Sequence, residues 1–557
     1  MVRNVTVLAV AAAVVALPFL LRQPAETDDW RPGDPVLTIV TPHNEAIRYE
    51  FARAFSEWHR QHHGRPVKVD WLNIGGTTEI SRYLVSEYVA AMRAWWTAQG
   101  KPWPAGAADD MLAIQPSQFP EIHAAFRAVD DPGKVTARID LFFGGGEYDH
   151  TRLFQQGLTV PVTGLPDFGY PAQISGETWR TATLFGNTVS TFGICYNRDR
   201  LRDLGVVTPP RRWVDLTAPV YFGQVGVADP TKSGSIAKAF EMIIQQQCHE
   251  AVRAAGFTDA QVDELERAGK DFPPAYNAAV GQGWLNGVRL VQLIGANARY
   301  FTDSASKVPI DVSTGDAAVG LAIDFYARFQ AQTSRDARGA ERMVYVTPAG
   351  GSSVSCDPVG LLRGAPNRTV AVRFIEFTLS EAGQKLWCYR PGTPGGPKKY
   401  ALRRLPIREE FYRQADRHLP FVSDPLNDPL INPYRLAEQF VYRSRWTARL
   451  FNVQRDLIRA MCLDSADELR AAWRAIVRAG GPARCPAAMA ALQRLPVTWA
   501  NAREVTSRQD RLTYLGEWTE FFRRNYREAR NQVGQTASLS AAGNRGGDKQ
   551  DACLILP

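Results

Sequence analysis

Several motifs that would fix a catalytic or nucleotide-binding function are missing from this sequence. Its 557 residues contain no GxGxxG dinucleotide fingerprint, no P-loop and no GxSxG nucleophile elbow. No block of five or six like charges occurs beside stacking aromatics, so we expect no nucleic-acid binding. The net charge of +8 and the pI near 9.1 therefore indicate only a general preference for anionic partners.

Cysteine is scarce and unclustered. The seven cysteines form no CxxC pair and no Cys/His cluster, which argues against a zinc site. In an oxidising compartment one or two disulfides could form, and the pairs to expect first are Cys462–Cys485 and Cys356–Cys388. The odd count leaves one thiol over.

The N-terminal segment has the pattern of an export signal. Arg3 precedes an apolar run from Val5 to Leu21, and an acidic, proline-containing stretch follows. Residues 1–34 are therefore predicted to be a signal peptide or a transmembrane signal anchor with a linker, and the remaining chain to lie outside the cytoplasm. The length, with 45% hydrophobic and 22% charged residues, suits two to four ordinary folded domains.

The N-terminal half alternates strands with helices. Apolar runs at 35–42 and 67–72 predict strands, each followed by a helical pattern, and 139–143 predicts a third strand. This βαβα order indicates an α/β fold with a parallel sheet and helices on both faces. Ligands gather at the carboxyl ends of such strands, so His43 and Thr77 are expected at the ligand edge.

Gly144, Gly145 and Gly146 follow the third strand. They would let a ligand or another backbone approach closely, although a tight turn explains them equally well. Further strands are expected at 190–196, 308–312, 343–348 and 359–362.

The segment 223–247 is the most informative stretch of the chain. A short strand ends at Pro230, and Ser233 is placed as the N-cap of a helix with a regular apolar stripe. The free N–H groups of its first turn, two hydroxyls and Lys232 predict an anion receptor at Ser233, Gly234 and Ser235. A capped turn with solvated hydroxyls is the alternative, and this stretch alone leaves both open.

Several stretches together resemble the bacterial extracellular solute-binding proteins of ABC importers, in the subgroup that includes ferric-iron binders. They lie between Val36 and Trp387 and include LTIVTPHNE, IDLFFGGGEYDH, STFGICYNRDRL, STGDAAVGLAIDFY, VTPAGGSSVSCDPVGLLRGAPN and FIEFTLSEAGQKLW. The resemblance implies a type 2 periplasmic-binding-protein fold, in which two lobes joined by a hinge close on a ligand in an interlobe cleft. The expected divisions are lobe 1 at 35–192 with an insertion at about 89–136, lobe 2 at 193–345, a return to lobe 1 at 346–399, a helical C-terminal extension at 400–534 and a disordered tail at 535–557.

The resemblance and the strand-end argument place one set of residues around the cleft. The chain would cross between the lobes near Thr191–Tyr196 and return near Val344–Pro348. The expected ligand-binding residues are His43, Thr77, Gly144, Gly145, Gly146, Ser190, Ser233, Gly234, Ser235 and Tyr326.

Two classes of cargo remain open. Ferric binders of this family use a histidine, a carboxylate and two adjacent tyrosines, which would correspond here to His43, Glu147 and Tyr326. Phe325 stands where the first tyrosine of the pair would be, so one phenolate is missing. The alternative is a small oxyanion, such as a phosphate ester, phosphonate or carboxylate, held at the helix start after Lys232.

The resemblance implies a binding protein and not an enzyme. It would be a monomeric periplasmic component that delivers a small anion or an Fe(III) complex to an ABC permease in the inner membrane, without a cofactor of its own. One alternative is a sensor that presents its closed form to a membrane kinase. The other is a serine acyltransferase using Ser235 and Lys238, which match SxxK, but the KTG-like element at 232–234 overlaps this motif and cannot face it across a pocket.

Overall fold

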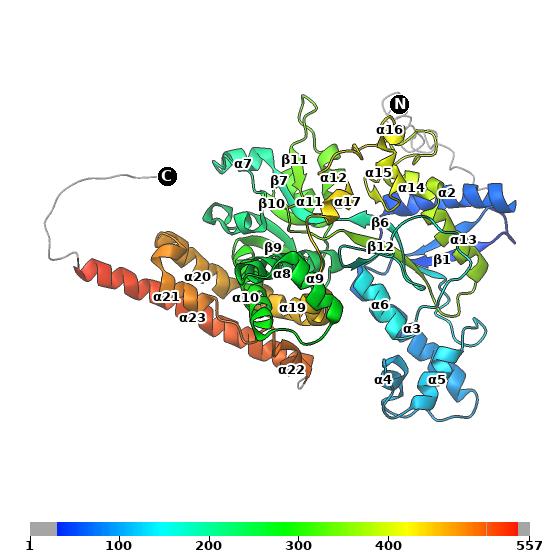
Figure 1. The fold of residues 1–557 in the computed structure, drawn as a ribbon, viewed down its shortest axis with the longest axis horizontal. Helices are drawn as coiled ribbons and strands as arrows, with labels where there is room; N and C mark the ends of the chain where they lie inside the picture. The colour runs from blue at the N-terminus through cyan, green and yellow to red at the C-terminus, as the bar shows by residue number, and fades with distance from the viewer. Residues whose placement is uncertain (1–29, 508–509, 544–557) are drawn as a thin grey trace, which may run out of the picture.

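The computed structural model describes residues 30–507 and 510–543, so the predicted apolar signal segment lies outside the described residues. Two mixed β-sheets lie side by side, each covered by helices, and they define two lobes (Figure 1). Within the described part of the chain, no helix has the length and apolar character needed to cross a bilayer.

Lobe 1 is built on a six-stranded sheet with the order β13-β6-β12-β3-β1-β2. Strands β1, β2 and β3 run parallel, as the βαβα pattern predicts, while β12 pairs antiparallel with both β3 and β6. Phe51 and Phe143 pack beside Trp387 in its core. The elements are β1 (Val36–Val40), β2 (Lys68–Leu72), β3 (Leu141–Phe143), β6 (Phe185–Ser190), β12 (Ser355–Leu361), β13 (Leu405–Pro406), α2 (Glu45–His63), α3 (Thr77–Thr97), α6 (Glu147–Gln155), α13 (Arg368–Leu379) and α14 (Glu381–Cys388), with a small hairpin of β4 (Gln173–Ile174) and β5 (Glu177–Thr178).

Lobe 2 is built on a five-stranded sheet with the order β11-β7-β10-β8-β9. Its helices α8 and α10 pack very closely, because a Cβ at Gly283 would lie 2.4 Å from the backbone of Cys248 and one at Gly287 would lie 2.5 Å from that of Ile244. The elements are β7 (Phe192–Asn197), β8 (Val225–Ala228), β9 (Ala298–Thr302), β10 (Val319–Ile323), β11 (Met343–Val346), α7 (Arg198–Asp203), α8 (Gly234–Ala254), α9 (Asp259–Ala268), α10 (Pro274–Ala296), α11 (Lys307–Thr314) and α12 (Asp324–Thr333).

Two extended segments connect the lobes. The chain leaves lobe 1 at Thr191, between β6 and β7, and returns through 347–354, between β11 and β12. The two crossovers touch, since Thr191 Oγ1 lies 3.0 Å from Thr347 Oγ1 and 3.1 Å from the hydroxyl of Tyr345. Two α/β lobes joined by paired crossovers confirm the predicted fold class.

Two expectations are wrong. Residues 308–312 form part of helix α11 and not a strand, because Val308 and Val312 are buried four residues apart on one helical face. The expected disulfides are absent: all six cysteines in the described residues are free. Cys356 Sγ donates to the Thr178 carbonyl, and the remaining thiols are buried at separate core positions.

The region 89–136 is a helical extension of lobe 1 with its own small core. Helix α3 continues to Thr97, and α4 (Ala107–Leu112) and α5 (Pro120–Ala128) pack against it. Tyr88 and Phe126 meet in this core at a ring distance of 6.0 Å.

The segment after residue 400 is divided between the lobes. Strand β13 pairs with β6, and apolar residues up to Tyr442 pack into lobe 1, whereas those from Trp446 onward pack into lobe 2. The chain therefore passes between the lobes a third time, at 442–446. Its helices are α15 (Glu410–Arg413), α16 (Ala415–His418), α17 (Pro433–Ala437), α18 (Ser444–Thr447), α19 (Phe451–Ile458), α20 (Ala466–Arg478), α21 (Pro486–Leu492), α22 (Ala502–Ser507) and α23 (Arg511–Gly543), the last continuing past Gln535, where the sequence analysis begins a disordered tail.

Candidate functional site

A cavity of about 680 Å³ lies between the two lobes. Lobe 1 contributes the loops after β1, β2 and β3, lobe 2 contributes the start of α8 and the residues around Phe325, and the C-terminal extension contributes further side chains. All predicted ligand-binding residues except Gly144 line it.

Three helices begin at this cavity: α3 after Gly76, α6 after Gly146 and α8 after Ser233. The two glycines bring no side-chain cap, and Ser233 Oγ accepts from the Ile236 N–H at 3.4 Å. The starts of α3 and α8 face each other, since a Cβ at Gly234 would lie 3.7 Å from Thr77 Oγ1. First-turn N–H groups and positive dipole ends from both lobes thus converge on one space, which suits an anion.

The triple glycine after β3 is needed for close approach. Gly144 and Gly145 have φ of +98° and +97°. A Cβ at Gly144 would lie 2.8 Å from the ring of His43, and one at Gly145 would lie 2.8 Å from the Thr77 methyl group. Gly144 therefore supports the site from behind His43, although it does not line the cavity itself.

One end of the cavity holds a buried charged cluster. His43 Nε2 lies 3.1 Å from Asp357 Oδ2 and 3.3 Å from Arg404 Nη1, and Arg404 also donates to Ser190 Oγ at 3.1 Å. Burial lowers the pKa of His43, although Asp357 acts in the opposite direction. Burial alone would raise the pKa of Asp357, but Arg404 and His43 together bring it down to about 2.

This cluster does not favour the predicted iron ligands. His43 Nε2 lies beside a guanidinium, which would repel Fe(III). Glu147 is associated with a different group of charges, around Lys238. Among the residues that the structure describes, no three His, Cys, Asp or Glu side chains are placed to hold a metal ion.

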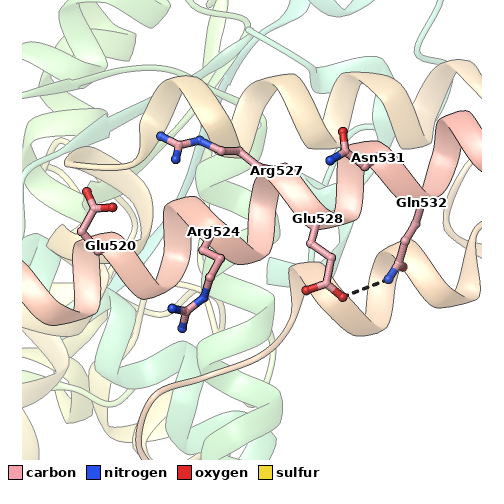
Figure 2. A pocket seen from close by; sticks show the side chains of 6 residues that line it. All are labelled: Glu520, Arg524, Arg527, Glu528, Asn531 and Gln532. Atoms are coloured by element: carbon pink, nitrogen blue, oxygen red, sulfur yellow. Dashed lines mark hydrogen bonds between the residues drawn. The ribbon is translucent and has the colours of Figure 1, made fainter.

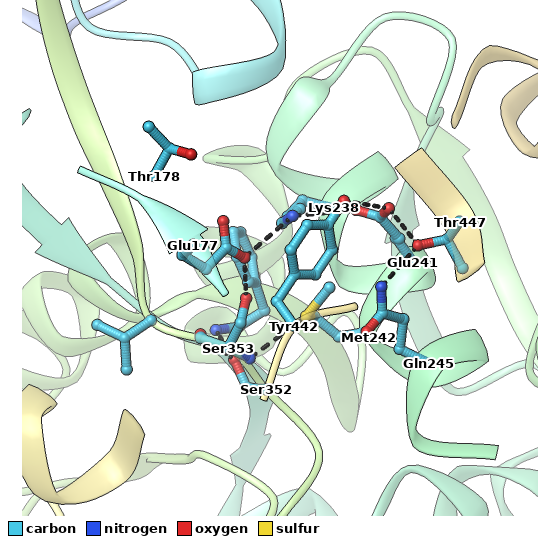
Figure 3. A network of polar contacts seen from close by, with 12 residues as sticks. Glu177, Thr178, Lys238, Glu241, Met242, Gln245, Ser352, Ser353, Tyr442 and Thr447 are labelled. Atoms are coloured by element: carbon cyan, nitrogen blue, oxygen red, sulfur yellow. Dashed lines mark hydrogen bonds and ion pairs between the residues drawn. The ribbon is translucent and has the colours of Figure 1, made fainter. Parts of the chain in front are cut away.

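The other end of the cavity is centred on Lys238 (Figure 3). Its ammonium lies 3.0 Å from Glu177 Oε1, 3.1 Å from Glu241 Oε2 and 3.6 Å from the ring centroid of Tyr442. Burial opposes its charge, but the two carboxylates outweigh burial and raise the pKa of Lys238 well above its ordinary value. A lysine held protonated cannot serve Ser235 as a general base, which argues against the acyltransferase alternative.

Sequence reasoning found the helix start at Ser233–Ser235 but missed, among other residues of the cavity wall, Asp357, Arg404 and Tyr442. No local motif marks them, and Arg404 reaches His43 across 361 positions of the chain. Lys232 lines the cavity, as expected for the anion receptor, and its ammonium pairs with Asp303 at 2.7 Å.

A second depression lies along α23 (Figure 2). Three of its four charged side chains are paired: Glu520 lies 3.1 Å from Arg523, Arg527 lies 2.8 Å from Glu468, and Glu528 lies 2.6 Å from Arg494. A surface whose charges are mostly paired offers little to a charged ligand, so we place the functional site in the interlobe cavity.

The chain is similar to one curated protein and to several solved structures. A curated protein of Haemophilus influenzae named only as uncharacterized is 23% identical over 259 residues, which are 45% of this chain and 62% of that protein, so the chain spans about three-fifths of that relative. The solved structure of the periplasmic binding protein AfuA from Actinobacillus pleuropneumoniae, with exogenous fructose-6-phosphate bound, is 15% identical, with 75% and 98% of the two chains covered and a TM-score of 0.46. Iron-bound HitA from Pseudomonas aeruginosa is 16% identical, with 63% and 83% covered and a TM-score of 0.38.

Residues 139–413, just under half of the chain, match a family model described as bacterial extracellular solute-binding protein. This range contains β3 with its glycines, both crossovers, the helix start at Ser233 and Arg404. Over these residues the chain is similar to the bacterial extracellular solute-binding proteins.

Proposed function

We propose that this protein is the periplasmic solute-binding component of an ABC importer and that its cargo is a small organic molecule bearing a phosphoryl or similar oxyanion group. The observation that carries the proposal is the convergence of the α3, α6 and α8 N-termini on one interlobe cavity. Backbone N–H groups at such helix starts bind oxyanions without needing a cationic side chain.

The position of these helices links binding to closure. Helices α3 and α6 belong to lobe 1 and α8 to lobe 2, so an anion held by all three contacts both lobes. Those contacts form together only when the lobes are closed, which gives the ligand the differential affinity that shifts a hinge equilibrium. The closed, loaded form is what we expect to deliver cargo to the permease.

Iron is the weaker cargo in this geometry. The buried cluster at His43 already contains the Arg404 guanidinium, which would repel a ferric ion bound there. A phosphorylated solute carries the opposite charge and meets no such repulsion from Arg404.

A binding experiment with a matched control tests the proposal. Purified protein is titrated calorimetrically with fructose 6-phosphate, inorganic phosphate, a phosphonate and ferric citrate, after a thermal-shift screen of the same probes. In the Ser233→Ala, Ser235→Ala double variant, the affinity for the binding anion should fall at least tenfold, because each hydrogen bond to a charged group contributes about 1.5–3 kcal/mol.

The control is Ser380→Ala. Ser380 caps α14 by accepting from the Gly383 N–H at 3.3 Å and does not line the cavity. Its substitution therefore removes the same kind of helix cap away from the binding site. This variant should keep parental affinity. Anion affinity in the double variant within twofold of the parent would exclude the Ser233 and Ser235 hydroxyls as ligands of the anion. Binding of ferric citrate, with no binding of the phosphorylated probes, would favour iron as the cargo.

A further inference from the structure

Residues 442–458, here called the strap, tie the two lobes together beyond the matched family region, which ends at 413. At the start of the strap, the Tyr442 N–H donates to the Ser175 carbonyl of lobe 1 at 2.8 Å. The next residue turns to lobe 2, where the Arg443 N–H donates to Gln245 Oε1 at 2.9 Å. The strap therefore has backbone contacts with both lobes within two consecutive residues.

The end of the strap spans the helix starts. Arg455 Nε donates to the Pro230 carbonyl at 2.7 Å, and Nη2 donates to the Thr231 carbonyl at 2.9 Å, both in lobe 2. The same Nη2 donates to Thr78 Oγ1 of lobe 1 at 2.8 Å. One buried guanidinium thus joins α3 to the loop before α8.

A neighbouring pair repeats this connection. Asn452 Nδ2 donates to the hydroxyl of Tyr148 in α6 at 2.7 Å, and the ring of Phe451 lies 4.8 Å from the same tyrosine. Phe451 and Ala448 also line the cavity, so the strap is part of the wall around the cargo space.

Tyr442 connects the strap to the charged end of the cavity (Figure 3). Its hydroxyl donates to Glu241 Oε1 at 2.8 Å while its ring covers the Lys238 ammonium. Lys238 belongs to lobe 2 and pairs with Glu177 of lobe 1. The tyrosine therefore positions the lysine for an ion pair that crosses between the lobes.

We propose that the strap completes the binding site as a third wall and acts as a latch that holds the lobes closed before cargo arrives. Two crossovers alone leave lobes free to rotate about the hinge, but opening here must break the contacts of Arg455 with Thr78, of Asn452 with Tyr148 and of Lys238 with Glu177. A latch that raises the closed fraction slows cargo entry and tightens apparent binding. The proposal concerns closure and does not depend on the identity of the cargo.

The interlobe distance tests the latch directly. Nitroxide labels are placed on the full chain at Ile114→Cys of lobe 1 and Val207→Cys of lobe 2, positions that are 68% and 94% exposed, in a Cys553→Ser background. The six other cysteines are buried. Thr78→Val removes the lobe 1 acceptor with little change of shape, and Thr97→Val, at the far end of the same helix, loses only hydroxyl bonds to its own helix.

Pulsed dipolar spectroscopy without ligand should show one short distance in the labelled parent and in Thr97→Val. Thr78→Val should add a population at longer distance, and Arg455→Met, which removes all four hydrogen bonds of this guanidinium, should enlarge it. Circular dichroism confirms that each variant is folded. Superimposable distance distributions in all four proteins would overturn the latch.

Kinetics with fructose 6-phosphate separate this proposal from the cargo proposal. Thr78→Val should increase the association rate at least threefold and weaken affinity, with Thr97→Val unchanged. Unchanged association in Thr78→Val, with cargo binding intact, contradicts the latch. If fructose 6-phosphate and the other phosphorylated probes fail to bind, the proposed cargo is wrong, while the distance measurement still decides the latch.

Discussion

A buried histidine makes the stability of this protein depend on pH in a direction that can be calculated. His249, in α8, is 8% exposed, and its Nε2 lies 2.8 Å from the Val441 carbonyl next to the strap. Burial lowers its pKa from 6.5 to about 4, although the carbonyl acts in the opposite direction. The unfolded chain therefore takes up a proton at His249 before the folded chain does, and stability must fall as the pH drops below 6.5.

The size of the effect follows from the shift. One pKa unit corresponds to about 1.4 kcal/mol, so His249 costs about 2 kcal/mol of unfolding free energy between pH 7 and pH 5, and about 3 kcal/mol below pH 4. His150, with a pKa lowered by burial to about 4, acts in the same direction. Asp149 opposes them, because burial raises its pKa to about 6 and acidification then stabilises the folded state. A difference between variants isolates His249 from both.

The assay is urea unfolding of the parent and of His249→Gln at pH 7 and pH 5. A glutamine amide can still donate to the Val441 carbonyl but takes up no proton in this range. The parent should lose about 2 kcal/mol more than His249→Gln on acidification, and His62→Gln, which changes an exposed histidine of α2, should behave like the parent. Equal losses of unfolding free energy in the parent and in His249→Gln would show that burial of the neutral His249 ring does not make stability depend on pH.

Two further substitutions test the packing around the strap. Gly176→Ala should lower the unfolding free energy by at least 2 kcal/mol more than Gly164→Ala. Both glycines have φ of +82°, but a Cβ at Gly176 would lie 1.9 Å from the Tyr442 carbonyl oxygen, while Gly164 has nothing within 4 Å. Equal effects of the two substitutions in thermal unfolding would show that the backbone at Tyr442 moves aside at no cost. Lys238→Met should lower the unfolding free energy by about 3–5 kcal/mol at pH 7, measured by denaturant unfolding, because Glu177 and Glu241 stay buried without their cation. Adding Glu241→Gln should recover part of that loss, since it removes one of the two unpaired carboxylates. No recovery in the double variant would contradict the charge argument.

The parts of the fold that could be predicted are those with a strong local signal. The strands at β1, β2 and β3 are short apolar runs bounded by turn residues, and the cap at Ser233 precedes a regular apolar stripe. Strand-end geometry then placed His43 and Thr77 at the cavity without any knowledge of long-range contacts. The strand expected at 308–312 failed because five mostly apolar residues fit a buried helix turn equally well.

The other parts of the fold depend on which elements pack against each other, and hydrophobic periodicity does not specify this. The helices after residue 400 show the apolar stripe of any packed helix, and that stripe does not specify which lobe they cover. Arg404 and Tyr442 become cavity residues only because β13 pairs with β6 and the chain then crosses to lobe 2. Each contact joins residues about 200 or more positions apart, such as Tyr442 with Glu241, and a single sequence carries no signal for it.

The charges that line the cavity decide which substitution tests the anion proposal most directly. The cationic side chains that line it are all used within the protein: Lys232 pairs with Asp303, Lys238 with Glu177 and Glu241, and Arg404 with Asp357. Carboxylates outnumber these cations along the walls, so net side-chain charge does not attract an anion to this space. What remains for an oxyanion is the set of backbone N–H groups at the helix starts together with the hydroxyls of Ser233 and Ser235, where binding depends on hydrogen-bond geometry. Substitution of the serines at the start of α8, rather than of any lysine, is therefore the decisive test of the proposed cargo.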